Sequence, residues 1–246
     1  MKRFILTVSA MLAMAFSCFA ANPESDFIYD MAPDGEGVMI KQYKGKSTTV
    51  VFPDTIEGLP VTQIGSNDTL DGWVFSNRDI PYNITVPKSV KVIGGWAFSG
   101  IKGKINIDLS NITSIGDGAF TNSDLSGTIT ISKNLEFDGS KEYPSNVCTA
   151  VFSGTKITAV VIEEGVTSLK GEDLFYKCPE LKSVTIPASL TEIGQFAFAQ
   201  CSALTEVKIP EGTKINYIGS NAFPGCTSLS LATKAKIKAS GYTGGF

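Results

Sequence analysis

A short motif recurs along most of the sequence and constrains the fold more than any other feature. It runs apolar, any, apolar, Pro, any, any, apolar, any, any, Ile, Gly, any, any, Ala, Phe, and it is complete at 84–98 and 184–198. Its final phenylalanine recurs at seven places, the register phenylalanines: Phe75, Phe98, Phe120, Phe152, Phe175, Phe198 and Phe223. Four of the six intervals between them are 22 or 23 residues. This period predicts a solenoid, in which each unit is too small to be stable alone and packs on its neighbours.

A strand is predicted near the start of each unit, because two apolar residues flank one variable residue there. Residues two apart in a strand share a face, so the apolar pair points inward and the residue between them points outward. The apolar pairs are Val50/Phe52, Ile84/Val86, Ile105/Ile107, Ile129/Ile131, Val160/Ile162, Val184/Ile186 and Val207/Ile209. Stacking of the units is expected to place these strands side by side in one parallel sheet.

The rest of each unit must return the chain to the next strand. Proline lacks the N–H that pairing needs, so it ends the strand. Ile-Gly adds a second inward side chain and a permissive backbone position. The Ala-Phe segment is expected to form a short helical or 3₁₀ turn with its phenylalanine inside. Two stretches depart from the period: 132–150 is predicted to be a surface loop because it is rich in charge and turn formers, and 66–83 is irregular.

The first twenty residues have the pattern of a secretory signal peptide. Lys2 and Arg3 precede the uncharged run Phe4 to Phe16, and Ala20 offers a small residue for cleavage. The apolar run is shorter than the ~20 residues that cross a bilayer, and no transmembrane segment is predicted elsewhere. An alternative is a lipoprotein signal with a lipid anchor at Cys18. Both interpretations place the mature chain outside the cytoplasm, where disulfides can form.

Both ends of a solenoid expose apolar surface and unpaired strand edges, so both need covers. At the N-terminal end, 27–43 contains two apolar segments around a turn at Pro33-Asp34-Gly35. At the C-terminal end, the alanines and lysines of 232–240 predict a short capping helix before Gly241. The predicted organisation is therefore a signal peptide at 1–20, an N-terminal cap at 21–48, a solenoid of about seven units at 49–231 and a C-terminal cap at 232–246.

The repeat unit resembles the BspA-type leucine-rich repeat. The resemblance rests on Leu-x-x-Val-x-Ile-Pro, Ile-Gly and Ala-Phe-x-x-Cys-x-x-Leu, which occur together at 181–210, and it covers about 27–246. It implies an α/β repeat solenoid with parallel β-strands on one face and turns and short helices on the other. It also implies a bacterial protein that is secreted or bound to the cell surface and that adheres to host proteins or other cells. The unit at 138–152 lacks Ile-Gly, and Leu169-Lys170-Gly171 replaces it in the next unit.

Composition excludes several kinds of chemistry. The sequence contains no histidine, so a Ser-His-Asp triad and a histidine-containing metal site are excluded. The formal net charge of −3 disfavours a nucleic-acid partner. The densest acidic spots, Glu163-Glu164 and Glu172-Asp173, are interpreted as solvated charge, because adjacent strand residues point to opposite faces and no second pair recurs opposite them. We therefore expect no enzymatic activity and no cofactor.

Three cysteines follow register phenylalanines by three residues each, namely Cys178, Cys201 and Cys226. One hypothesis is a three-thiolate metal site or a disulfide between adjacent turns, whose Cα atoms satisfy the distance window. The other is a buried row of small apolar side chains, which free cysteine resembles in packing. Zinc sites usually pair cysteines two to four residues apart, which favours the buried row. Cys148 lies alone in the 132–150 stretch, either paired or free.

The outward residues between the apolar pairs form the predicted binding surface. This outward column consists of Thr85, Asn106, Thr130, Val161, Thr185 and Lys208. Hydroxyl and amide groups suit protein or glycan ligands, although threonine also favours strands for its own reasons. Trp73 is added as an aromatic that can stack on a sugar or anchor a protein, with partial burial as the alternative.

The sequence thus favours a non-catalytic binding or adhesion module for a macromolecular ligand, a host extracellular protein or a glycan. One alternative is a carbohydrate-active enzyme or a glycan-binding accessory protein on a β-solenoid. Another is a structural spacer in a cell-envelope complex.

Overall fold

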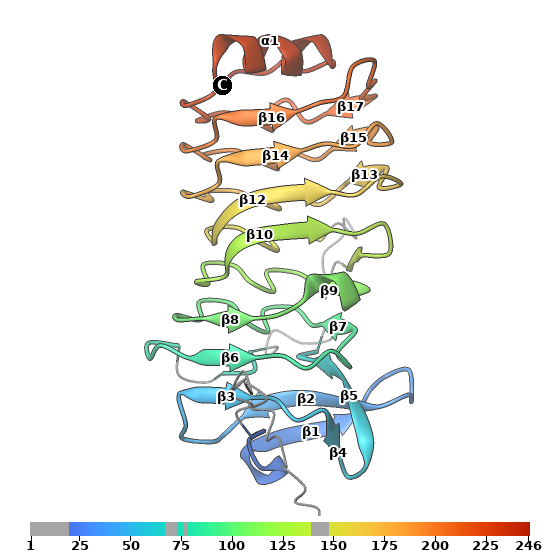
Figure 1. Ribbon diagram of the computed structural model, residues 1–246, viewed down its shortest axis with the longest axis vertical. Coiled ribbons are helices and arrows are strands. Elements are labelled where there is room, and N and C mark those ends of the chain that lie inside the picture. The colour runs from blue at the N-terminus through green and yellow to red at the C-terminus, as the bar shows by residue number, and fades with distance from the viewer. Residues whose placement is uncertain (1–19, 67–72, 76–77, 139–147) are drawn as a thin grey trace, which may run out of the picture.

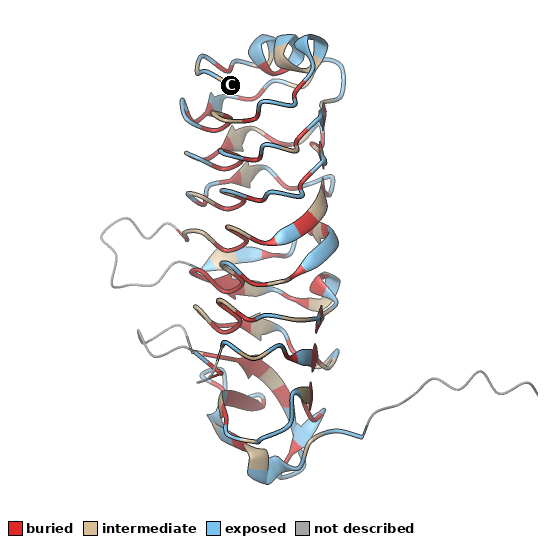
Figure 2. Ribbon diagram, turned by 90° about the vertical axis from the view of Figure 1, so that its left-hand side faces the viewer, coloured by how far each residue is buried: buried red, intermediate tan, exposed pale blue. Residues whose placement is uncertain are grey.

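The turns of the chain stack along one long axis, from the N-terminal strands at one end to a helix at the other (Figure 1). The computed structural model describes residues 20–66, 73–75, 78–138 and 148–246. The predicted signal peptide, apart from Ala20, and Cys18 therefore lie outside the described residues. Buried positions recur in every turn of the coil (Figure 2).

The predicted strands form on one side of the coil, but in two parallel sheets. The first contains β3 (Thr49–Val51), β6 (Asn83–Thr85) and β8 (Ile105–Asn106), and the second contains β10 (Ser126–Ile131), β12 (Lys156–Ile162), β14 (Ser183–Thr185) and β16 (Glu206–Lys208). The apolar pairs face the core as predicted, with Ile107 and Ile209 only partly buried.

The prediction of one continuous sheet is wrong between β8 and β10. The 3₁₀ helix η2 (Leu109–Asn111) follows β8 and packs against β10. Asp108 stands where four of the other six units have proline, and its side chain accepts a hydrogen bond from the Ser110 N–H at 3.0 Å. The cap starts the 3₁₀ helix, and buried Leu109 fills the interior there.

The Ile-Gly segments form a second set of strands. One sheet has the order β1 (Phe27–Met31), β2 (Val38–Tyr43), β5 (Leu59–Ile64), β7 (Val92–Ile93), β9 (Ser114–Gly116) and β11 (Glu136–Asp138), with β4 (Thr55–Ile56) paired to β5. The other contains β13 (Ser168–Leu169), β15 (Glu192–Ile193) and β17 (Tyr217–Ile218).

The two units without Ile-Gly still pair in this set. Phe137 in β11 aligns with Ile115, and Leu169 in β13 aligns with Ile193. The prediction that all of 132–150 is a surface loop is therefore wrong, because β11 lies within it and Leu135 and Cys148 are buried. Residues 139–147 lie outside the described part of the chain.

The register phenylalanines line one shared interior row, as predicted. From Phe98 to Phe223 the ring centroids of neighbours lie 5.3–5.6 Å apart, with interplanar angles of 4–16°. The segments that carry them are tight turns and not the short helices expected from the sequence. From Phe98 to Phe198, the residues two before and two after each register phenylalanine adopt left-handed conformations, such as Phe196 (φ 54°) and Gln200 (φ 62°), and a helix requires consecutive right-handed residues.

Within two residues of the register phenylalanines, the backbone hydrogen bonds between described turns run in one direction. Phe98 donates its N–H to Ala119 at 2.8 Å, and Phe175 donates to Ala197 at 2.9 Å. In each bond the donor lies one turn closer to the N-terminus than the acceptor. At the C-terminal end the Phe223 N–H donates to the Tyr242 hydroxyl at 3.4 Å.

The two ends of the coil carry different structures. The 3₁₀ helix η1 (Glu24–Asp26) leads into an antiparallel hairpin of β1 and β2. Helix α1 (Leu231–Ala239) lies over the other end, close to the predicted position, and its N-cap Ser230 accepts a hydrogen bond from the Thr233 N–H. The domain limits given above stay a prediction. Among the described residues, no helix combines the length and the apolar character needed to cross a bilayer.

Candidate ligand-binding face

The outward column is aligned by strand pairing. In the first sheet Thr85 lies beside Asn106. In the second sheet Thr130 aligns with Val161, Val161 with Thr185, and Thr185 with Lys208. All six side chains are half-buried or exposed. The column therefore consists of two accessible rows, one of two residues and one of four, separated by the break between β8 and β10.

Trp73 does not belong to this column. It precedes Phe75 by two residues, in a turn whose Val74 carbonyl accepts the Tyr43 N–H at 2.7 Å. This turn lies on the side of the register phenylalanines. The Trp73 side chain is 45% exposed, and the guanidinium carbon of Arg78 lies 4.0 Å from the centroid of its ring. Trp73 thus presents an accessible aromatic–cation pair away from the strands.

A hollow opens on the column at the break between the two sheets. Its volume is about 340 Å³, and Asn106 and Thr130 lie on its opposite sides. Lys104, Asp108 and Ser110 make the lining polar. The interruption of the ladder therefore produces a recess that an uninterrupted sheet would lack.

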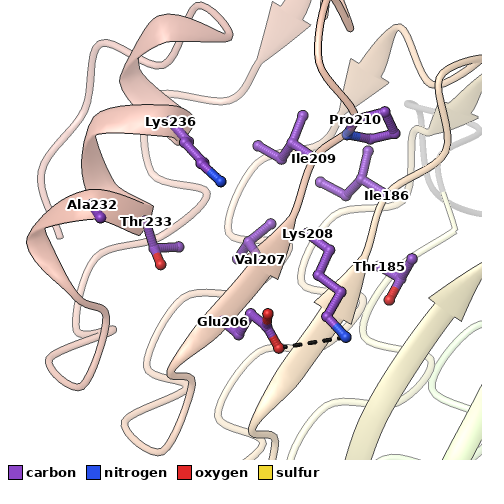
Figure 3. A pocket seen from close by; sticks show the side chains of 10 residues that line it. All are labelled: Thr185, Ile186, Glu206, Val207, Lys208, Ile209, Pro210, Ala232, Thr233 and Lys236. Carbon is purple, nitrogen blue, oxygen red and sulfur yellow. Dashed lines mark ion pairs between the residues drawn. The ribbon is translucent and has the colours of Figure 1, made fainter.

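A second hollow lies at the C-terminal end of the column, between β16 and α1 (Figure 3). Its volume is about 350 Å³, and Thr185 and Lys208 of the column line it. The opposite side of the hollow is formed by α1, through Ala232, Thr233 and Lys236. Sequence reasoning missed these helix residues, although the three lysines of 234–238 were a visible signal.

The cysteines form the buried row. Cys178, Cys201 and Cys226 are free, and each donates its S–H to the carbonyl of the previous register phenylalanine, at 3.1, 3.0 and 3.2 Å. Metal binding requires deprotonated cysteines and would therefore release the thiol protons that these hydrogen bonds use. Burial raises the pKa of the Cys226 thiol to about 12, which keeps it protonated at neutral pH. The structure thus shows a packing role.

Cys148 is also a free, buried thiol. It donates to the Ile115 carbonyl at 3.6 Å. Burial and the negative charge of Asp117 raise its pKa. Asp117 itself accepts a hydrogen bond from the Thr149 N–H at 2.6 Å. The pair therefore joins two turns of the coil and offers no reactive thiolate.

The acidic spots have structural contacts. Glu164 accepts a hydrogen bond from the Ala188 N–H at 3.1 Å, and Glu172 pairs through its backbone with Thr149. Burial, followed by the charge of Glu172, raises the pKa of Asp173. Within the described ranges, no group of three or more Cys, Asp or Glu residues could hold a metal ion.

Comparison with known proteins agrees with this architecture. A leucine-rich repeat protein of T. pallidum is 27% identical, has a TM-score of 0.72, and matches 92% of this chain and 99% of its own. Two other leucine-rich repeat proteins superimpose less closely. The one from Bacteroides ovatus is 21% identical, with 83% of this chain and 80% of its own covered and a TM-score of 0.29. The one from Eubacterium ventriosum is 22% identical, with 74% of this chain and 60% of its own covered and a TM-score of 0.41.

No curated protein matches the chain. A family model, by contrast, matches most of it. The model of the BspA-type leucine-rich repeat region matches in six copies, over residues 47–170 and 145–239. The stacked phenylalanine turns and the short parallel strands are the three-dimensional form of those copies. The chain is therefore a member of the BspA-type leucine-rich repeat family.

Proposed function

We propose that this protein is an exported, non-catalytic module that binds a host protein or a glycan on the outward column. The observation that carries the proposal is the alignment of Thr130, Val161, Thr185 and Lys208 on four neighbouring strands. Their side chains occupy positions that the core does not need. A repeated surface of this kind is how solenoid proteins present extended binding faces.

The chemistry of the column suits polar macromolecules. Hydroxyl, amide and ammonium groups offer donors and acceptors at the strand spacing of about 4.8 Å. The pattern of residues 1–20 supports export, to the extracellular space or the bacterial surface. Family membership supports binding over catalysis.

Binding by the column is tested with arrays of extracellular host proteins and cell-surface glycans probed with residues 21–246. Thr130→Arg and Thr185→Arg place bulky charge on the column, and we expect each to reduce binding at least about tenfold by steric exclusion. Thr227→Arg changes an exposed threonine outside the column and serves as the matched control. Binding that resists both column variants contradicts the proposal.

Export is tested by the mass of the mature N-terminus from the native source. Cleavage after Ala20 gives a free secreted chain, and a lipid-modified Cys18 gives an anchored one. An N-terminus that retains Met1 contradicts export.

A further inference from the structure

β16 is the last strand of its sheet, and part of its backbone faces away from β14. The Ile186 N–H donates to the Lys208 carbonyl at 2.9 Å, so the outward residues of β16 pair with β14. In a parallel pair, the residues between them direct their backbone groups to the opposite side. Those residues are Val207 and Ile209. Among the described residues, neither amide finds a partner in α1.

Helix α1 covers this edge without closing it. The hollow of about 350 Å³ between β16 and α1 adjoins one of about 550 Å³, and both are lined by Ile209, Pro210 and Lys236. A further strand would lie about 4.8 Å from β16, on the side where these hollows open. The edge therefore has both free hydrogen-bonding groups and room beside it.

The helix side of the groove carries one positive charge. α1 has no acidic residue, and of its three lysines Lys236 lines both hollows, whereas Lys234 and Lys238 lie over the Phe246 ring at 5.5 and 5.6 Å. Lys236 points from α1 into the hollow toward Ile209 (Figure 3). Lys208 is paired with Glu206 at 3.6 Å, whereas Lys236 has no ion pair within the described part of the chain. A ligand strand with acidic side chains complements this surface.

We propose that the groove between β16 and α1 binds an extended acidic peptide segment of a partner protein as an added strand. The Val207 and Ile209 amides donate to its backbone, and Lys236 pairs with one of its carboxylates. Main-chain bonding of this kind gives affinity with little demand on sequence, and Lys236 favours acidic segments. The proposal rests on the proposed binding function and names a second, protein-type partner site for it.

The probe is an acetylated, amidated nine-residue peptide of alternating valine and glutamate, carrying a fluorophore. Its lysine counterpart, alternating valine and lysine, is the charge control. Fluorescence anisotropy with residues 21–246 is expected to show saturable binding of the glutamate peptide and at least about tenfold weaker binding of the lysine peptide. Amide NMR signals of Val207 and Ile209 are expected to shift on binding.

Two pairs of variants locate the site. Ala232→Trp fills the groove and should abolish binding, whereas Ala235→Trp changes an exposed alanine of the same helix outside the lining and should not. Lys236→Glu should weaken binding about three- to tenfold, and Lys234→Glu, with the same change of charge, should weaken it less. Circular dichroism verifies that each variant is folded.

Absence of binding at 1 mM peptide overturns the inference, and so does binding that Ala232→Trp leaves unchanged. Ligands captured by the outward column, by contrast, should depend on Thr130 whatever happens at α1. Absence of peptide binding by the natural chain, with array binding retained, therefore rejects only the groove, and the reverse result rejects only the column.

Discussion

On the side of the register phenylalanines, the rings from Phe98 to Phe223 stack at 5.3–5.6 Å without interruption, whereas the strand side is split between β8 and β10. The difference reflects what each side must supply. Every turn needs one large side chain to fill the interior, so the phenylalanine row tolerates no gap. A strand ladder can be replaced locally, as η2 does with a 3₁₀ turn and buried Leu109. Both hollows on the column arise where the ladder stops.

The comparison predicts its largest effect at the centre of the phenylalanine row. Phe175→Ala removes a fully buried ring that stacks on both neighbours, and we expect a loss of about 3–5 kcal/mol in the free energy of unfolding. Urea unfolding followed by circular dichroism measures it. Phe196→Ala, at a site 39% exposed, is the control and should cost far less. Equal losses would show that the row is not what holds the turns together.

A smaller effect is expected for the cysteines behind the row. Cys201→Ala removes the S–H that satisfies the Phe175 carbonyl at 3.0 Å, at an expected cost of about 1–3 kcal/mol in the free energy of unfolding. Cys201→Thr should recover little of this loss, because Thr155, which is fully buried at the equivalent position, donates to the carbonyl of its own turn's phenylalanine, Phe152, at 2.8 Å and not to that of the previous turn. If threonine restores in urea unfolding the stability that alanine loses, the hydrogen bond to Phe175 is not the reason for the cysteine.

The break in the strand side can be probed by pH through Asp124. Burial alone would raise the pKa of Asp124, but hydrogen bonds from Lys156 (2.9 Å) and from the Gly103 N–H (3.1 Å) outweigh it and hold the pKa below its ordinary value of 3.8. A depressed pKa in the folded state gives stability that is present above pH ~4 and lost as the pH falls through the folded pKa.

The matched variant for this test is Asp124→Asn. It should unfold about 1 kcal/mol more easily than the natural chain at pH 7, and the difference should shrink as the pH falls below ~4 toward pH 2. Urea titrations at both pH values measure it. A difference that stays constant with pH would assign the effect to packing.

The smallest effect is expected on the outward column. Thr185→Ala should change the free energy of unfolding by less than about 0.5 kcal/mol, because the side chain is half-buried and its place in the sheet depends on backbone bonds. Thermal and urea unfolding measure it. A loss above 1 kcal/mol would mean that the column serves stability, and the case for recognition there would weaken.

The phenylalanine row could be predicted from the sequence because it depends on periodicity alone. The conformation of its turns could not, because the left-handed backbone at Phe196 and Gln200 is disfavoured for such residues, and at Gln200 it accompanies an N–H bond to the Pro224 carbonyl of the next turn. The outward column followed from alternation, but its division did not, since it depends on the 3₁₀ turn at Leu109. Trp73 was grouped with the column because nothing in the sequence fixes the side of an irregular turn.

Because the hydrogen bonds between the phenylalanine turns run in one direction, the two ends of the coil expose different backbone groups. The first turn offers carbonyl oxygens, which the Tyr43 N–H meets at Val74, and the last offers N–H groups, which the Tyr242 hydroxyl meets at Phe223. A duplicated unit inserted after Phe175 would find matching donors and acceptors on both sides. Repeat units can therefore be added in the middle of such a chain, whereas each end must keep a cap of its own kind.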